Sequence, residues 1–106
     1  MMWYLLDENK EPYPVSLEES YQLFHDLDMK IVQQDKLDNG MFVSTVFLGL
    51  DHDWSDDPDH VPVLFETMVF CSDDVDQIYE YQERYTSYAD ALAGHQRALD
   101  YANKIN

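Results

Sequence analysis

The apolar residues of this chain follow two different spacings along the sequence. In five segments they alternate with polar residues or form short runs rich in β-branched and aromatic side chains, which is typical of strands. In two others they recur every three or four positions, which is typical of amphipathic helices. The first spacing predicts strands at residues 3–6, 31–37, 41–50, 61–71 and 78–85, the first of them at an edge.

Both predicted helices carry a start signal. Ser16 and Glu19 match a capping box, in which the serine oxygen accepts a backbone N–H of the first turn and the glutamate reaches back. This predicts a helix over residues 17–28. Thr86 or Ser87 is expected to cap the second helix. The apolar stripe of the first helix is Leu17, Tyr21, Phe24 and Leu27, and that of the second is Tyr88, Leu92, His95, Leu99 and Ala102.

The turn at Asp38-Asn39-Gly40 predicts a tight hairpin, because Asn and Gly readily adopt the positive backbone angles that such turns require. The strand after it, residues 41–50, has apolar residues at consecutive positions and therefore on both faces. Such a strand is covered on both sides or meets a partner chain. These elements predict an α+β fold, with an antiparallel sheet of four to five strands and two helices packed on it.

Composition limits the class of protein. The 106 residues carry 22 Asp and Glu against 6 Lys and Arg, for a formal net charge of −16 at pH 7. This charge disfavours direct binding to nucleic acid and favours attraction to basic partners. The hydrophobic fraction of 45% and the aromatic fraction of 14% are those of a folded chain rather than a disordered acidic tail. We therefore expect a single domain, residues 1–106.

The compartment is predicted from cysteine usage and from the start of the chain. Cys71 is the single cysteine, so no disulfide can form within the chain. No secretion signal and no apolar run of membrane-spanning length is apparent, which predicts a cytoplasmic protein without membrane contact. No glycine-rich phosphate loop occurs either, and no cofactor is predicted.

Three sequence blocks occur in a fixed order: residues 43–52 (VSTVFLGLDH), residues 64–70 (LFETMVF), and residues 84–86 (RYT) running into 91–95 (ALAGH). Together they extend over about half of the chain and resemble a family of small bacteriophage and prophage proteins. The resemblance carries no assigned chemistry, so it implies a setting and no catalytic role. A small phage accessory protein acts inside a bacterial cell, often against host machinery or host defence. The run 53–59 departs from the family's shorter Gly-rich and Pro-rich segment.

Two predicted loops are rich in aspartate. A rigid array of carboxylates can imitate DNA phosphates, which recur about every 1.7 Å along the duplex axis, and can compete for a groove lined by Lys and Arg. The alternative is an ordinary solvated surface that contributes solubility. The candidate partner-binding residues are Asp53, Asp56, Asp57 and Asp59 in the first loop and Asp73, Asp74 and Asp76 in the second.

A second set of residues offers ligand-binding or acid–base chemistry. Asp51 and His52 follow a strand, and His60 stands across the loop, so carboxylate and imidazole groups could converge there. The spacing lacks a closely spaced His pair, which favours an acidic loop with incidental histidines, and no metal is predicted. His95 lies on a helix stripe and is interpreted first as a core residue, and as a general base only if Glu66 lies beside it.

Glu66 is a carboxylate in an otherwise apolar strand, on the same face as Met68. If Asp51 pairs near Pro62, Glu66 falls opposite Phe47, in a possible cluster with Asp51 on one face of the sheet. The alternative is that Glu66 points to solvent on the outer face or bonds a group such as Arg84.

Three hypotheses follow. The first is a phage-type accessory protein that binds and inhibits a basic host protein, such as a CRISPR or restriction nuclease, through an acidic surface that mimics DNA. The second is a small ligand- or metal-binding protein, or an enzyme, that uses Asp51, His52, Glu66 and His95. The third is a structural protein that forms a homodimer or larger homo-oligomer by burying its two-faced strands against another copy. Charge and resemblance together favour the first.

Overall fold

The computed structural model describes residues 2–51, 59–71 and 78–104. Within these residues the strands are β1 (Trp3–Leu6), β2 (Pro12–Val15), β3 (Ile31–Lys36), β4 (Met41–Phe47), β5 (Phe65–Cys71) and β6 (Ile78–Tyr85). The helical segments are α1 (Leu17–Ser20), α2 (Gln22–His25), the 3₁₀ turn η1 (Leu27–Lys30) and α3 (Tyr88–Asn103). Strands β3 to β6 form a four-stranded antiparallel sheet in chain order, and β1 and β2 form a separate two-stranded hairpin.

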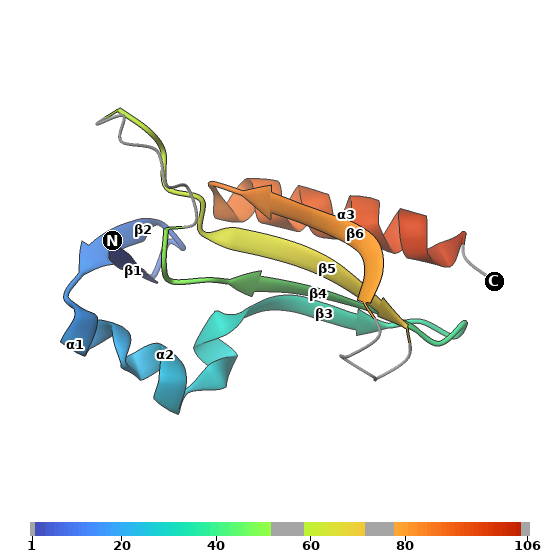
Figure 1. Cartoon of the computed structure of the whole chain (residues 1–106), viewed down its shortest axis with the longest axis horizontal. Coiled ribbons are helices and arrows are strands. Elements are labelled where there is room, and N and C mark those ends of the chain that lie inside the picture. Colours follow the sequence, from blue (N-terminus) through green and yellow to red (C-terminus); the bar gives the residue numbers. More distant parts are fainter. Residues whose placement is uncertain (1, 52–58, 72–77, 105–106) are drawn as a thin grey trace.

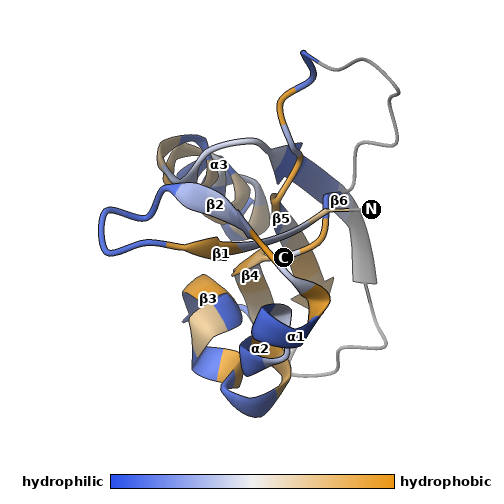
Figure 2. Ribbon diagram, turned by 90° about the vertical axis from the view of Figure 1, so that its left-hand side faces the viewer, coloured by the Kyte–Doolittle hydropathy of each residue, from blue (hydrophilic) through white to orange (hydrophobic). Residues whose placement is uncertain are grey.

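Helix α3 lies on one side of the four-stranded sheet. Helix α3 runs along this side, and the β1–β2 hairpin and the short helices gather at the end of the sheet where β4 finishes (Figure 1). Phe47 at the end of β4 joins Leu5 of β1, Leu23 of α2 and Ala91 of α3 in one buried cluster. In the end-on view the hairpin lies between α3 and the short helices, and no described helix or strand runs along the face of the sheet opposite α3 (Figure 2).

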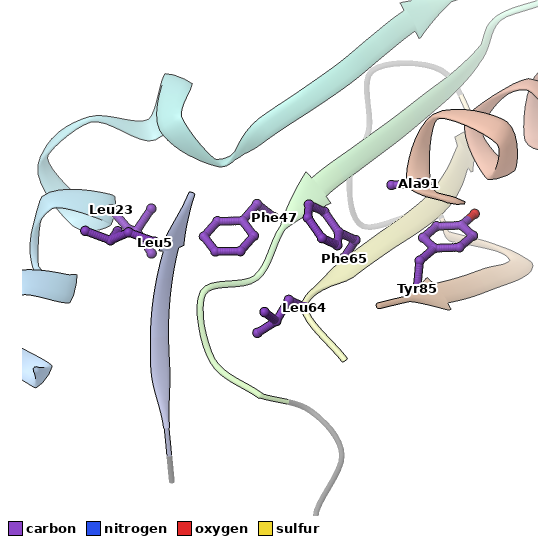
Figure 3. Close-up of a cluster of buried hydrophobic side chains, with 7 residues drawn as sticks. All are labelled: Leu5, Leu23, Phe47, Leu64, Phe65, Tyr85 and Ala91. Atoms are coloured by element: carbon purple, nitrogen blue, oxygen red, sulfur yellow. The ribbon is translucent and has the colours of Figure 1, made fainter. Parts of the chain in front are cut away.

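The α+β class predicted from the sequence is confirmed, with helices packed on an antiparallel sheet. The core consists of two clusters of buried side chains. One cluster extends from α2 through β1 and β4 to the start of α3 and includes Leu64, Phe65 and Tyr85 (Figure 3). A second lies under the C-terminal half of α3 and contains Met41, Val43, Val69, Ala98 and Ala102. None of the helices formed by the described residues is long and apolar enough to cross a membrane.

The first strand is not part of the main sheet, which corrects the edge position expected for it. β1 pairs with β2, a strand that the sequence pattern does not predict because it contains two prolines. Tyr4 lies opposite Pro14, yet its N–H donates to the Gly49 carbonyl at 2.7 Å, away from β2. That pair is therefore a non-hydrogen-bonded one, and the nitrogens of Pro12 and Pro14 face the free edge of β2. At these positions the edge has no N–H to offer another strand.

The two central strands are shorter than their apolar runs. β4 ends at Phe47 because Gly49 takes a φ of 78° and turns the chain toward β1. A side chain at this position would clash, since a Cβ would lie 2.4 Å from Cδ1 of Leu23. β5 begins only at Phe65, after the Leu64 carbonyl has accepted the Leu48 N–H at 2.6 Å.

The hairpin between β3 and β4 is confirmed, but its turn is wider than expected. Gly40 takes a φ of 87° while Asn39 keeps a negative φ, and the Leu37 N–H closes the turn on the Met41 carbonyl at 2.8 Å. The Asn39 amide donates to the Ala102 carbonyl at 2.8 Å, and its oxygen accepts the Met41 N–H at 3.0 Å. The asparagine therefore ties this hairpin to the C-terminal end of α3.

Helix α3 starts where the sequence places it, because the Ser87 hydroxyl accepts the Asp90 N–H at 3.1 Å. The predicted stripe is only partly correct, since Leu92 is 40% exposed. The face that meets the sheet consists mainly of small side chains, which let the helix backbone approach closely. Its buried residues are Ala91, Gly94, His95, Ala98 and Ala102.

We expect Gly94→Ala to destabilise the protein. A Cβ at this position would lie 2.0 Å from the Tyr85 hydroxyl, so α3 or Tyr85 would have to move. Overpacking of this kind lowers the free energy of unfolding by about 1–3 kcal/mol, whereas helix propensity alone would raise it by about 1 kcal/mol. Urea denaturation of both proteins measures the sign, and a stabilised variant would contradict the close approach.

We also expect an alkaline loss of stability that depends on Tyr81. Burial, and then the neighbouring Glu83, raise the pKa of this phenol to about 12 from 10.0. The folded state therefore holds the Tyr81 proton more tightly than the unfolded state. The stability that this proton adds to the folded state is fully present below pH 10 and is lost as the pH rises through about 12. Tyr81→Phe should flatten the fall in Tm over this interval, and an unchanged slope would contradict the assignment.

Candidate functional site

A chain of buried hydrogen bonds joins α3 to all four strands of the sheet. His95 of α3 places Nε2 2.7 Å from the Asp35 carboxylate of β3 and Nδ1 2.6 Å from the Thr45 hydroxyl of β4. The Thr45 hydroxyl lies 2.5 Å from that of Thr67 in β5, which accepts the Tyr85 hydroxyl of β6 at 3.1 Å. Sequence reasoning found only His95, because the other four residues are not neighbours until the strands pair.

When the His95 imidazole is neutral, the donors and acceptors of this chain run in one direction. A carboxylate accepts but does not donate, so His95 Nε2–H donates to Asp35, and the neutral imidazole then accepts at Nδ1. Thr45 donates to that nitrogen, and Thr67 donates to Thr45. The phenol of Tyr85 donates to Thr67. Each hydroxyl between the ends thus donates once and accepts once, which satisfies the buried polar groups.

Carboxylate, imidazole and hydroxyl in this order also make up the triads of nucleophilic catalysis. Here the hydroxyl cannot reach a substrate, because Thr45, Thr67 and His95 are each 0% exposed beneath α3. Asp35 is the most exposed of the five residues, with 39% of its side chain exposed, whereas Tyr85 is 6% exposed. The arrangement therefore acts as a polar network within the core that fixes α3 on the sheet, in agreement with the core interpretation of His95.

We expect Thr45→Val to lower the free energy of unfolding by about 1–3 kcal/mol, although the side chains have nearly the same shape. The change leaves Nδ1 of His95 without its donor and Thr67 without its acceptor, both fully buried. Thr45→Ser keeps the hydroxyl and removes one methyl, so about 1 kcal/mol or less should be lost. Equal losses in the two variants, measured by urea denaturation, would contradict the network.

The predicted ligand set does not come together. Asp51 is nearly buried after β4, where its carboxylate accepts the Val63 N–H at 3.0 Å and lies 2.6 Å from Nε2 of His60. This carboxylate joins the chain segments that enter and leave the loop. His52 lies outside the described residues. Among the described residues, no group of three or more His, Cys, Asp or Glu side chains could hold a metal ion.

The register places Glu66 on the other side of the sheet from His95. Glu66 pairs with Val46, one residue away from the Phe47 partner expected from the loop, and a shift by one residue moves a side chain to the opposite face. The glutamate accepts Nε of Arg84 at 2.8 Å and the Gln82 amide at 2.6 Å. The expected cluster with Asp51 is therefore wrong, and the alternative with Arg84 is confirmed.

The aspartate-rich loops lie mostly outside the described residues. Asp59 is exposed at the end of the first loop. The structure does not describe Asp53, Asp56 and Asp57 of the first loop or Asp73, Asp74 and Asp76 of the second.

The first predicted helix is broken, and its apolar stripe faces outward. The capping box at Ser16 is confirmed, but α1 ends after one turn at Ser20 and α2 begins at Gln22. The residues of this segment that face the core are Ser20 and Leu23, at 0% and 2% exposure, and not those of the predicted stripe. We call the four exposed side chains the outward stripe: Leu17 at 53%, Tyr21 at 48%, Phe24 at 59% and Leu27 at 67% exposure.

The outward stripe belongs to a longer apolar surface. Phe24 lies between two other rings, with its centroid 6.2 Å from that of Trp3 and 6.3 Å from that of Tyr21. Met29 and Ile31, at 38% and 41% exposure, extend the surface to the start of β3. Apolar residues recur along this segment of the ribbon (Figure 2). Exposed apolar side chains that gather on one segment are a feature of many protein-binding surfaces.

A small cavity lies beside this surface, behind Met29 of η1. Its volume is about 110 Å³, and Leu5, Leu6, Leu23, Phe47 and Lys10 complete the lining. A larger groove of about 470 Å³ lies between β2 and the start of α3. Its lining is Tyr4, Glu11, Pro12, Pro14, Val61, Pro62, Leu64, Thr86 and Ser87.

Comparison of the chain with protein-family models, with curated proteins and with solved structures gives no match.

Proposed function

We propose that this chain is a non-enzymatic accessory protein of phage type that binds and inhibits a basic host protein, and that the outward stripe is its docking surface. The observation that carries the proposal is the exposure of Leu17, Tyr21, Phe24 and Leu27 on one segment. An amphipathic segment on a sheet normally turns its apolar stripe to the core. Here the stripe is presented to solvent instead, as protein-binding helices present theirs.

The charges around the stripe define the partner. Residues 17–31 carry four carboxylates, from Glu18, Glu19, Asp26 and Asp28, against one lysine. An apolar centre with an acidic rim complements a partner segment that has apolar side chains flanked by Lys or Arg. The net charge of −16 extends this attraction over the whole surface, to which the aspartate-rich loops contribute. A basic protein that binds nucleic acid, such as a defence nuclease, has this chemistry.

The cavity beside Met29 offers a place for one anchoring side chain. Leucine and phenylalanine side chains line it, so it suits an aliphatic or aromatic group. A few buried anchors usually supply most of the affinity of an interface. The polar rim then contributes to partner choice and to the association rate.

The first test is an affinity capture from bacterial lysate at low and raised salt, with the double variant Phe24→Ser and Leu27→Ser beside the natural sequence. We expect a basic protein that the natural sequence retains and the double variant loses. Both side chains are more than half exposed, so the fold should survive the change. Leu92→Ser is the matched control, since Leu92 is 40% exposed but lies on α3.

With the captured protein purified, the double variant should bind about tenfold more weakly or worse, which corresponds to about 1.4 kcal/mol. Asp26→Asn with Asp28→Asn should instead slow association and reduce its salt dependence. Asn at position 26 keeps the oxygen that caps η1. Replacement of Asp56, Asp57, Asp73 and Asp74 by Asn tests the loops in the same assay. Equal binding by the stripe variant and the control would overturn the docking surface.

A further inference from the structure

The larger groove, between β2 and the start of α3, has the size of a ligand site. Its volume of about 470 Å³ lies within the range of about 300–1,000 Å³ that is usual for small-molecule pockets. The hairpin, the chain that leads into β5 and the turn before α3 build it, at the end of the sheet where β4 finishes (Figure 1). It shares no lining residue with the outward stripe.

The walls of the groove are apolar and stiff. Three prolines, Pro12, Pro14 and Pro62, line it together with Val61 and the ring of Tyr4. A proline side chain has almost no rotamer freedom to lose when a ligand packs against it. Walls of this kind favour binding, because little conformational entropy is lost. They suit an apolar ring or a short alkyl chain.

The polar groups of the groove accept hydrogen bonds more readily than they donate them. Glu11 is the charged side chain of the described lining, and within the described part of the chain no group bonds its carboxylate. The hydroxyls of Tyr4 and Thr86 are likewise unbonded there. At Pro12 and Pro14 the free edge of β2 has carbonyl groups but no N–H. A ligand that brings its own donors therefore fits this lining.

A carboxylate outside the lining adds to the negative charge at the groove. Burial and then the nearby Asp51 raise the pKa of the Tyr4 phenol, so the Asp51 charge is felt at this ring. The whole chain, with its net charge of −16, contributes in the same direction. The field at the groove thus favours a cation.

The positive groups near the groove are held elsewhere or offset. Lys10 lines the smaller cavity, and its ammonium lies 6.0 Å from the centroid of the Tyr88 ring. The positive end of the α3 dipole carries Asp90 in its first turn, and the Ser87 hydroxyl already accepts the Asp90 N–H at 3.1 Å. Neither group makes the groove a site for an anion.

We propose that this groove binds a small organic cation, a protonated amine carried on an apolar ring or chain. The ammonium group pairs with Glu11, and the apolar body packs between the prolines and Tyr4. A small molecule suits the groove better than an added strand of a partner does, because β2 has no N–H at Pro12 and Pro14 to pair with such a strand. The site is independent of the outward stripe.

Methyl NMR of the natural protein tests the site without a variant. At about pH 8 phenethylamine is protonated and an ordinary imidazole is neutral. We expect this amine to shift the signals of Val61, Leu64 and Thr86 in a saturable way. Its neutral analogue 2-phenylethanol should bind more weakly, and 3-phenylpropionate should not bind. Ethylamine, which lacks the apolar body, should leave these signals in place. Absent shifts, or equal binding by the amine and the propionate, would overturn the proposal.

Glu11→Gln removes the charge and keeps the size of the side chain. Glu11 is exposed and its carboxylate is unbonded in the described structure, so the fold should survive. The affinity for phenethylamine should fall about two- to fivefold, as for an exposed ion pair, and that for 2-phenylethanol should not change. Glu18→Gln is the matched control, because Glu18 is an exposed carboxylate of α1 outside the groove. An equal loss in both variants would show general attraction to an acidic chain and contradict the site.

The stripe variant, Phe24→Ser with Leu27→Ser, separates this proposal from the docking surface. It should bind phenethylamine as the natural sequence does, whether or not it has lost the captured protein. A different result would be a captured protein that shifts the Val61 and Thr86 signals and binds Glu11→Gln more weakly, while the amine shifts nothing. That outcome would assign the groove to the protein interface and overturn the small-cation site.

Discussion

The contact between α3 and the four-stranded sheet is the constraint on which the rest of the structure depends. One residue from each strand and one from the helix share a single chain of hydrogen bonds, from Asp35 through His95 to Tyr85. Leaving one of these buried groups unpaired would destabilise the fold by more than the bond itself contributes. The small side chains around Gly94 allow the approach that the bonds require. Packing and hydrogen bonding therefore demand the same helix position.

That position also decides which surfaces remain free. With α3 and the hairpin on one side, no described helix or strand runs along the other side of the sheet. Along α1 and α2, Ser20 and Leu23 are buried and the outward stripe is exposed.

Most local elements were predictable because their signals involve residues close in the sequence. The capping box at Ser16, the cap at Ser87 and the Gly40 turn are all confirmed. Errors arose where a distant contact overrides the local pattern. Pro12 and Pro14 disguise β2, which is a strand only because β1 lies beside it. The helix pattern predicts Leu92 on the buried face of α3, but Leu92 is 40% exposed, because the face that meets the sheet consists mainly of small side chains.

The sequence by itself determined the α+β class, the strong acidity and the apolar character of both the outward stripe and the central strand. Only the tertiary structure decided which of those apolar residues are buried, because burial depends on what packs against each face. It also decided the register between β4 and β5. A shift of one residue in this register would move Glu66 from the face where it bonds Arg84 to the face that holds His95. The polar network was also decided only by the tertiary structure, since its five residues come from five elements that only the folded chain brings together.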